Sequence, residues 1–166
     1  LCKYLLTNIS LSFSINSYYN SLKNKIPVSK DTIFEYLSYL EEANMIFLAP
    51  IFSYSLKVQQ ANPKKVYCID NGLRNAVAFK FSKDEGRLAE NLVFIELKRR
   101  EKDIYYWKNK GEVDFVIKDK YQNLTAINVS YADEIEQREI NSLLEFKKKF
   151  KKTKELIIIT KDLEKK

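Results

Sequence analysis

The amino-acid sequence predicts a mixed α+β protein in two parts. Helices and a strand hairpin form the first part, and the second has the order helix, three strands, helix, strand. Hydrophobic residues recur at helical spacing in several segments, and turn-forming residues bound runs rich in Ile, Val, Phe and Tyr. The 166 residues are 45% hydrophobic and 31% charged, which is typical of a folded chain rather than a disordered one.

The first part begins with helices. Residues 1–9 read as the middle of one helix, and apolar side chains at spacings of three and four predict another over residues 15–24. Ser29 is a suitable N-cap for a helix over residues 30–43, whose apolar stripe has the same spacing.

Two strands follow these helices. Residues 45–55 and 65–70 are rich in strand-forming side chains, and the turn-forming residues 59–63 lie between them. Helices followed by such a hairpin form a winged helix, which we therefore predict over residues 1–75.

A change of composition separates the two parts. Asn71-Gly72 interrupts the chain, and residues 82–86 form a polar break. The domain boundary should fall near residues 72–85, so we expect residues 1–75 and 76–166 to fold as separate domains.

The second part has a different pattern. A helix with lysine and arginine in its last turn is predicted over residues 86–100, and a second helix over residues 134–150. The last strand, residues 156–160, is almost wholly apolar, which predicts burial on both faces. With the remaining strands at 104–107, 112–118 and 124–131, the order is αβββαβ.

Composition excludes several functions. The three glycines are scattered, so the chain has no glycine-rich phosphate loop, and the absence of histidine removes most general bases and zinc sites. Cys2 and Cys68 lack metal-ligand spacing, which favours reduced thiols in a cytoplasmic protein. No apolar run is long enough to span a membrane, and the net charge of +7 permits an acidic partner.

Three segments carry a family resemblance: residues 86–97 (GRLAENLVFIEL), 110–117 (KGEVDFVI) and 127–131 (INVSY). With them, the chain resembles the C-terminal part of a prokaryotic family of AAA-type ATPases, a region long classed as a domain of unknown function. The resemblance implies that an N-terminal ATPase module, which would bind ATP, precedes this fragment and is its partner.

For the second part the resemblance implies a restriction-endonuclease-like, or PD-(D/E)XK, fold. Such nucleases hold Mg²⁺ with a helix Glu, a strand Asp and the Glu of a Glu-x-Lys on the next strand. The matching positions are Glu90, Asp114, Asn128 and Ser130. Because Asn128 lacks the charge of a carboxylate and Ser130 that of a lysine, we expect no nuclease activity from this degraded site.

Two readings of the remaining carboxylates stay open. Glu90 and Asp114 could form a weak site for Mg²⁺. Alternatively, Glu90 caps its helix or forms a salt bridge within it, Asp114 closes the hairpin by pairing with a nearby lysine such as Lys108 or Lys110, and Asn128 forms hydrogen bonds within the sheet.

The first part could face DNA or protein. Its second long helix, residues 29–42, has a net charge of −3, and exposed Phe34 and Tyr36 would suit a protein interface. Double-stranded DNA could instead be bound by lysines of the wing and of the basic run, namely Lys57, Lys64, Lys65, Lys147, Lys148 and Lys151.

The leading interpretation is a non-catalytic C-terminal module of an AAA-type ATPase that couples the motor to DNA or to a protein partner. One alternative is a metal-dependent DNA nuclease, and another is a purely protein-binding module.

Overall fold

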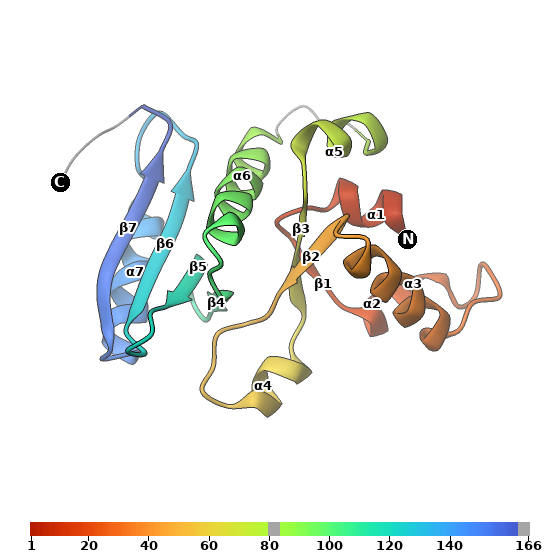
Figure 1. Cartoon of the computed structure of the whole chain (residues 1–166), viewed down its shortest axis with the longest axis horizontal. Coiled ribbons are helices and arrows are strands. Elements are labelled where there is room, and N and C mark those ends of the chain that lie inside the picture. The colour runs from red at the N-terminus through yellow and green to blue at the C-terminus, as the bar shows by residue number, and fades with distance from the viewer. Residues whose placement is uncertain (80–83, 163–166) are drawn as a thin grey trace.

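The computed structural model describes residues 1–79 and 84–162, within which the chain forms a mixed α+β fold of seven helices and two sheets (Figure 1). The elements of the first part are α1 (Cys2–Thr7), β1 (Ser12–Phe13), α2 (Ile15–Leu22), α3 (Lys30–Glu42), β2 (Ile46–Ala49), α4 (Leu56–Ala61), β3 (Lys64–Cys68) and α5 (Asn71–Val77).

The predicted helices and antiparallel strand pair of the first part are confirmed. The hydroxyls of Ser14 and Ser29 accept backbone N–H bonds in the first turns of α2 and α3, so both helices start at a capped residue. β3 lies between β1 and β2 in an antiparallel sheet. The core of this part consists of Leu5, Leu6, Ile9, Phe13, Ile33, Leu37, Ile46, Val66 and Cys68.

Two short helices lie where the sequence predicted turns. The connection between β2 and β3 contains α4, because the Ser55 hydroxyl accepts the N–H of Val58 and starts a helix. Asp70 does the same for α5 by accepting the N–H of Leu73 at 2.7 Å. The expectation that Asn71-Gly72 breaks the chain is therefore wrong, since both residues lie in the first turn of α5.

The second part confirms the predicted αβββαβ order. Its elements are α6 (Glu85–Arg99), β4 (Ile104–Lys108), β5 (Glu112–Lys118), β6 (Leu124–Ser130), α7 (Gln137–Lys149) and β7 (Thr153–Thr160). The strands form one sheet in the order β4-β5-β6-β7, in which β7 alone is parallel to its neighbour.

The prediction that the last strand is buried on both faces is wrong. β7 lies at the edge of the sheet, and its exposure alternates along the strand, with Ile157 and Ile159 each more than one third exposed. α7 packs on one face of the sheet, against β5, β6 and β7. α6 packs on β4 and β6 and also against β3 of the first sheet, so it lies between the two sheets (Figure 1).

The two parts share an apolar cluster. Tyr67 of β3 stacks on Phe94 of α6 with ring centroids 4.1 Å apart, and Phe115 of β5 packs beside both rings. Ala49, Ile104 and Ile127 complete this buried cluster. A shared apolar cluster therefore joins the two predicted domains, in addition to the core that lies within the first part. Residues 80–83, which contain part of the predicted boundary, lie outside the described residues.

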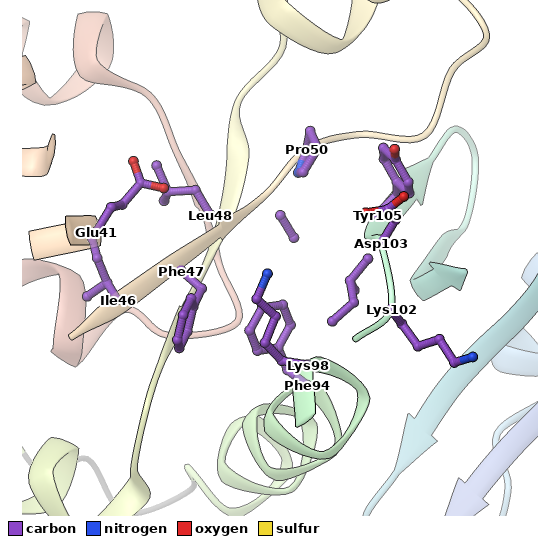
Figure 2. Close-up of a pocket in the computed structure, with 12 residues that line it drawn as sticks. Glu41, Ile46, Phe47, Leu48, Pro50, Phe94, Lys98, Lys102, Asp103 and Tyr105 are labelled. Carbon is purple, nitrogen blue, oxygen red and sulfur yellow. The ribbon is translucent and has the colours of Figure 1, made fainter. Parts of the chain in front are cut away.

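A small cavity marks the edge of this junction. Figure 2 shows Phe47 of β2 beside Phe94 and Lys98 of α6, and the lining residues of both parts enclose about 270 Å³. The Phe47 and Phe94 rings lie 5.7 Å apart, and the ammonium of Lys98 lies 5.8 Å from the Phe47 ring. Aromatic packing thus continues to the surface of the junction.

Candidate functional site

A buried ammonium group lies at the centre of the predicted nuclease-like site. Nζ of Lys65, from β3, is 3.0 Å from Glu90 of α6, 2.6 Å from Glu112 and 3.2 Å from Asp114, both of β5. The Lys65 side chain is 3% exposed. The first part therefore supplies the cation, and the second part supplies the three carboxylates.

Strand geometry explains this convergence. Side chains two residues apart on a strand point to the same face. Glu112 and Asp114 therefore project together from β5, and Lys65 and Tyr67 project together from β3. The Tyr67 hydroxyl donates to Oε1 of Glu90 at 2.7 Å, which gives that carboxylate a second donor from the first part.

Asn128 takes part in the sheet rather than facing the cation. Its side-chain oxygen accepts the backbone N–H of Asp114 at 3.1 Å, and its Nδ2 donates to the Glu139 carbonyl and the Ser142 hydroxyl. Asp114 is anchored in turn, because its Oδ2 accepts the N–H of Val129 at 2.9 Å. Strand β6 therefore holds both the backbone and the carboxylate of Asp114 in place.

Burial shifts the ionisation of this cluster. It raises the pKa of Glu90 to about 7, although the charge of Lys65 and the hydrogen bond from Tyr67 act in the opposite direction. For Lys65, burial alone would lower the pKa, but the three carboxylates raise it above its ordinary value. Burial also opposes ionisation of Glu112, yet Lys65 and Lys108 lower its pKa. The protonation state of each group in this cluster therefore depends on the charges of its neighbours.

Beside the cluster opens a cleft of about 790 Å³. Glu90, Glu112, Asp114 and Asn128 line it, so the structure brings together three of the four positions matched to the nuclease pattern. Its basic lining residues are Arg87, Lys108, Lys110 and Arg138.

Ser130, the fourth position, is buried, with 2% of its surface exposed. Within the described residues, its hydroxyl oxygen has no hydrogen-bond partner. Ser130 thus brings no positive charge to the site.

The predicted ion pairs of the carboxylates are wrong. Glu90 pairs with Lys65 rather than within its own helix, because α6 packs against β3. Asp114 also pairs with Lys65, and Lys108 instead binds Glu112 at 3.0 Å. The prediction that Asn128 forms hydrogen bonds within the sheet is confirmed.

The arrangement suits an ammonium group better than a metal ion. Distances of 2.6–3.2 Å are those of charge-assisted hydrogen bonds, whereas Mg²⁺ requires oxygens at about 2.0–2.1 Å. Within residues 1–79 and 84–162, no group of three or more Cys, Asp or Glu side chains is arranged to hold a metal ion.

Sequence reasoning missed Glu112, Tyr67 and the role of Lys65. The signal was present as two i, i+2 pairs, Glu112 with Asp114 and Lys65 with Tyr67, each on a predicted strand. Only the packing of α6 between the sheets shows that the two pairs meet.

Five of the six lysines predicted to contact DNA are exposed. Lys65 is the exception, since it is buried and bound to three carboxylates, and it is unavailable to a phosphate. The exposed lysines are Lys57, Lys64, Lys147, Lys148 and Lys151.

The connection that would form the wing is docked on the second part. The Phe52 N–H donates to the Tyr106 carbonyl at 2.6 Å, and the Tyr106 hydroxyl donates to the Pro63 carbonyl at 2.6 Å. This connection therefore lies against β4 at both its ends.

Two turns of the second part form a basic edge. The Leu124 N–H donates to the Lys152 carbonyl, which brings the β5–β6 turn beside the start of β7. Both turns lie at the lower left of Figure 1. We define the basic edge as Lys118, Lys120, Lys151, Lys152 and Lys154.

The exposure predicted for α3 is confirmed. Phe34 is 63% exposed and Tyr36 is 54% exposed. Cys2 and Cys68 are both free thiols, and Cys68 is buried. Across the described part of the chain, every helix is too short or too polar to cross a lipid bilayer.

Comparisons with known proteins place the chain among uncharacterised relatives. An uncharacterized protein of Methanocaldococcus jannaschii is 37% identical over 135 residues, 78% of this chain and 30% of that protein. An uncharacterized protein of Haemophilus influenzae is 28% identical over 151 residues, 90% of this chain and 38% of that protein. The chain thus spans about a third of the length of these relatives.

No solved structure matches the chain significantly. Residues 85–166 match the model of a domain of unknown function, DUF4143. Residues 2–84 match that of another, DUF8612, and because this match covers half of the chain, the protein belongs to the DUF8612 family.

Proposed function

We propose that the chain is a non-catalytic, double-stranded-DNA-binding module of a longer AAA-type ATPase, a winged helix joined to a degraded endonuclease-like domain. The observation that carries the proposal is the position of Lys65. Its ammonium group is held by Glu90, Glu112 and Asp114, where a nuclease of this type would hold a divalent cation.

Loss of catalysis follows from the chemistry of this site. A metal ion could take this position only if the buried ammonium group left, and Asn128, whose side-chain oxygen already accepts a hydrogen bond, would add no negative charge to hold it. Phosphodiester cleavage requires a cation on oxygen ligands near an activated water. An ammonium group with all its donors engaged cannot supply that function.

The basic edge supports DNA as the partner. Four of its five lysines are exposed, and the two turns that carry this edge lie beside each other at one end of the sheet. Such lysines bind phosphates without regard to sequence, and the affinity falls as salt rises because bound counterions are released. The acidic helix α3 lies at the other end of the molecule (Figure 1).

The test is a titration of duplex DNA at two salt concentrations, with and without Mg²⁺, in which both retention and cleavage are measured. We expect retention without cleavage. Lys120→Glu with Lys152→Glu should reduce the slope of log affinity against log salt by about 2.

The matched control is Lys23→Glu with Lys25→Glu, an equal change of charge on exposed residues at the end of α2. This control should keep most of the affinity. Cleavage that requires Mg²⁺ and is lost in Asp114→Ala would establish the nuclease alternative. Absence of salt-dependent retention would overturn the DNA proposal in favour of a protein-binding module.

A further inference from the structure

Helix α3 carries an exposed face that no other described element covers. We define the α3 acidic face as Glu35, Tyr36, Tyr39 and Glu42, all exposed and at helical spacing. Tyr36 and Tyr39 lie with ring centroids 6.4 Å apart and line an apolar pocket of about 300 Å³ with Leu1, Cys2 and Leu40. The face thus combines negative charge with an aromatic surface.

The carboxylates of this face are oriented but not neutralised. The Tyr39 hydroxyl donates to Oε1 of Glu35 at 2.6 Å, and the Ser38 hydroxyl donates to Oε1 of Glu42 at 3.3 Å. Among the described residues, neither Glu35 nor Glu42 has a cationic partner. Each carboxylate therefore has an oxygen available to an incoming ammonium group.

Helix α7 carries a surface of the opposite character. We define the α7 outer face as Leu144, Lys147 and Lys148, all exposed, with Leu144 46% exposed. The buried side of α7 consists of Ser142, Leu143 and Phe146, so the outer face points away from the sheet. In the described structure, neither lysine of this face has an acidic partner.

The two faces cannot meet within one molecule. α3 and α7 lie toward opposite ends of the longest axis, with α6 between them (Figure 1). Their charges are complementary, and each offers an apolar contact, Leu144 on one side and the Tyr36–Tyr39 pocket on the other.

We propose that the α3 acidic face docks the α7 outer face of a second copy of this chain. The Lys147 and Lys148 ammonium groups pair with the Glu35 and Glu42 carboxylates, and Leu144 enters the pocket beside Tyr36 and Tyr39. Because the two faces differ, the contact is heterologous, and it builds a ring or a row of subunits in which each copy contributes both faces. Charged residues set the register of such an interface, and apolar contact adds to its affinity.

This inference does not depend on the proposed function, because the basic edge is not one of the two faces. DNA binding by the edge and self-association through α3 and α7 can each fail without the other. The two experiments therefore distinguish them.

The experiment is sedimentation velocity on the 166-residue chain over a range of concentrations, at low and at high salt. We expect reversible association with a dissociation constant of about 10–100 μM, as for small, transient interfaces, weakened by salt because the charges are exposed.

Charge reversal tests the two faces separately. Glu35→Lys with Glu42→Lys, and Lys147→Glu with Lys148→Glu, should each shift association to at least tenfold higher concentration. Combining all four substitutions restores opposite charges across the contact and leaves the net charge at +7. We expect the fourfold variant to associate again, and circular dichroism should confirm that every variant is folded.

The control is Arg99→Glu with Lys102→Glu, exposed residues near the end of α6, which changes the net charge as much as the α7 variant does. It should associate like the unmodified chain. A chain that stays monomeric at 200 μM in low salt would overturn the proposal. So would a folded fourfold variant that fails to associate, or double variants that associate like the unmodified chain.

Discussion

The two parts of the molecule contain buried charge of opposite sign. The first part buries the ammonium group of Lys65 on β3, and the second part places three carboxylates, those of Glu90, Glu112 and Asp114, around one point. Within the assembled junction, either charge without its partner would be desolvated and unpaired, which costs several kcal/mol per ion. Together they form a hydrogen-bonded cluster.

The two parts therefore depend on each other at this junction. The shared apolar cluster leads to the same conclusion, because Tyr67 of β3 packs against Phe94 and Phe115 while its hydroxyl donates to Glu90. One residue thus belongs to both the apolar and the ionic contact. The junction specifies a single arrangement of the two sheets.

Separating the two parts should have the largest effect. Residues 1–79 expressed alone would expose Tyr67 and leave Lys65 without its carboxylates, so we expect no cooperative thermal unfolding of this fragment. Co-expression with residues 80–166 should restore one complex that elutes as a single particle. Fragments that each unfold cooperatively, at the temperature of the whole chain, would show that the junction is dispensable.

Replacing the buried ammonium group should have the next largest effect. Lys65→Met leaves three carboxylates close together without a counter-charge, and we expect a loss of about 3–5 kcal/mol in the free energy of unfolding by urea. Lys64→Met is the matched control, since Lys64 is the exposed neighbour on the same strand, and it should change stability by less than about 0.5 kcal/mol. Equal stability of the two variants would contradict the central role of the cluster.

The elements of the fold were largely predictable from local patterns. The strand over residues 112–118 has its predicted limits and the helix at residue 30 its predicted start, because strand alternation and the cap at Ser29 are properties of neighbouring residues. β7 was predicted to be more deeply buried than it is. Its apolar run reflects high strand propensity, whereas exposure depends on its position at the edge of the sheet.

The candidate site was predictable only in part. Glu90 and Asp114 were found through a resemblance of motifs, but their partner Lys65 lies 25 residues before Glu90 and was interpreted as a wing residue. A lysine in a strand is ordinarily exposed, so its burial follows from tertiary packing against α6 rather than from its own sequence context. Local sequence patterns do not show which distant segments of the chain pack against each other.

The smallest expected effect is on the pH dependence of folding stability, and it arises from the proton that Glu90 binds. Its pKa in the folded state is raised to about 7 by burial, against 4.5 for an unperturbed glutamate. Between these values the folded chain holds a proton that the unfolded chain has lost. The stabilisation from this group is therefore complete below pH 4.5 and is lost as the pH rises through 7. The groups that face the Glu90 carboxyl are Lys65, Tyr67 and Asp114.

Glu90→Gln should remove this dependence. We expect urea unfolding of the unmodified chain to show a fall in stability of about 1–3 kcal/mol between pH 4.5 and pH 7, relative to Glu90→Gln. Glu96→Gln is the control, because Glu96 is exposed on the same helix and should keep the slope of the unmodified chain. If the curves of Glu90→Gln and Glu96→Gln ran parallel over this range, Glu90 would be ionised throughout. The charge balance at the junction would then rest on a fully ionised set of three carboxylates around Lys65.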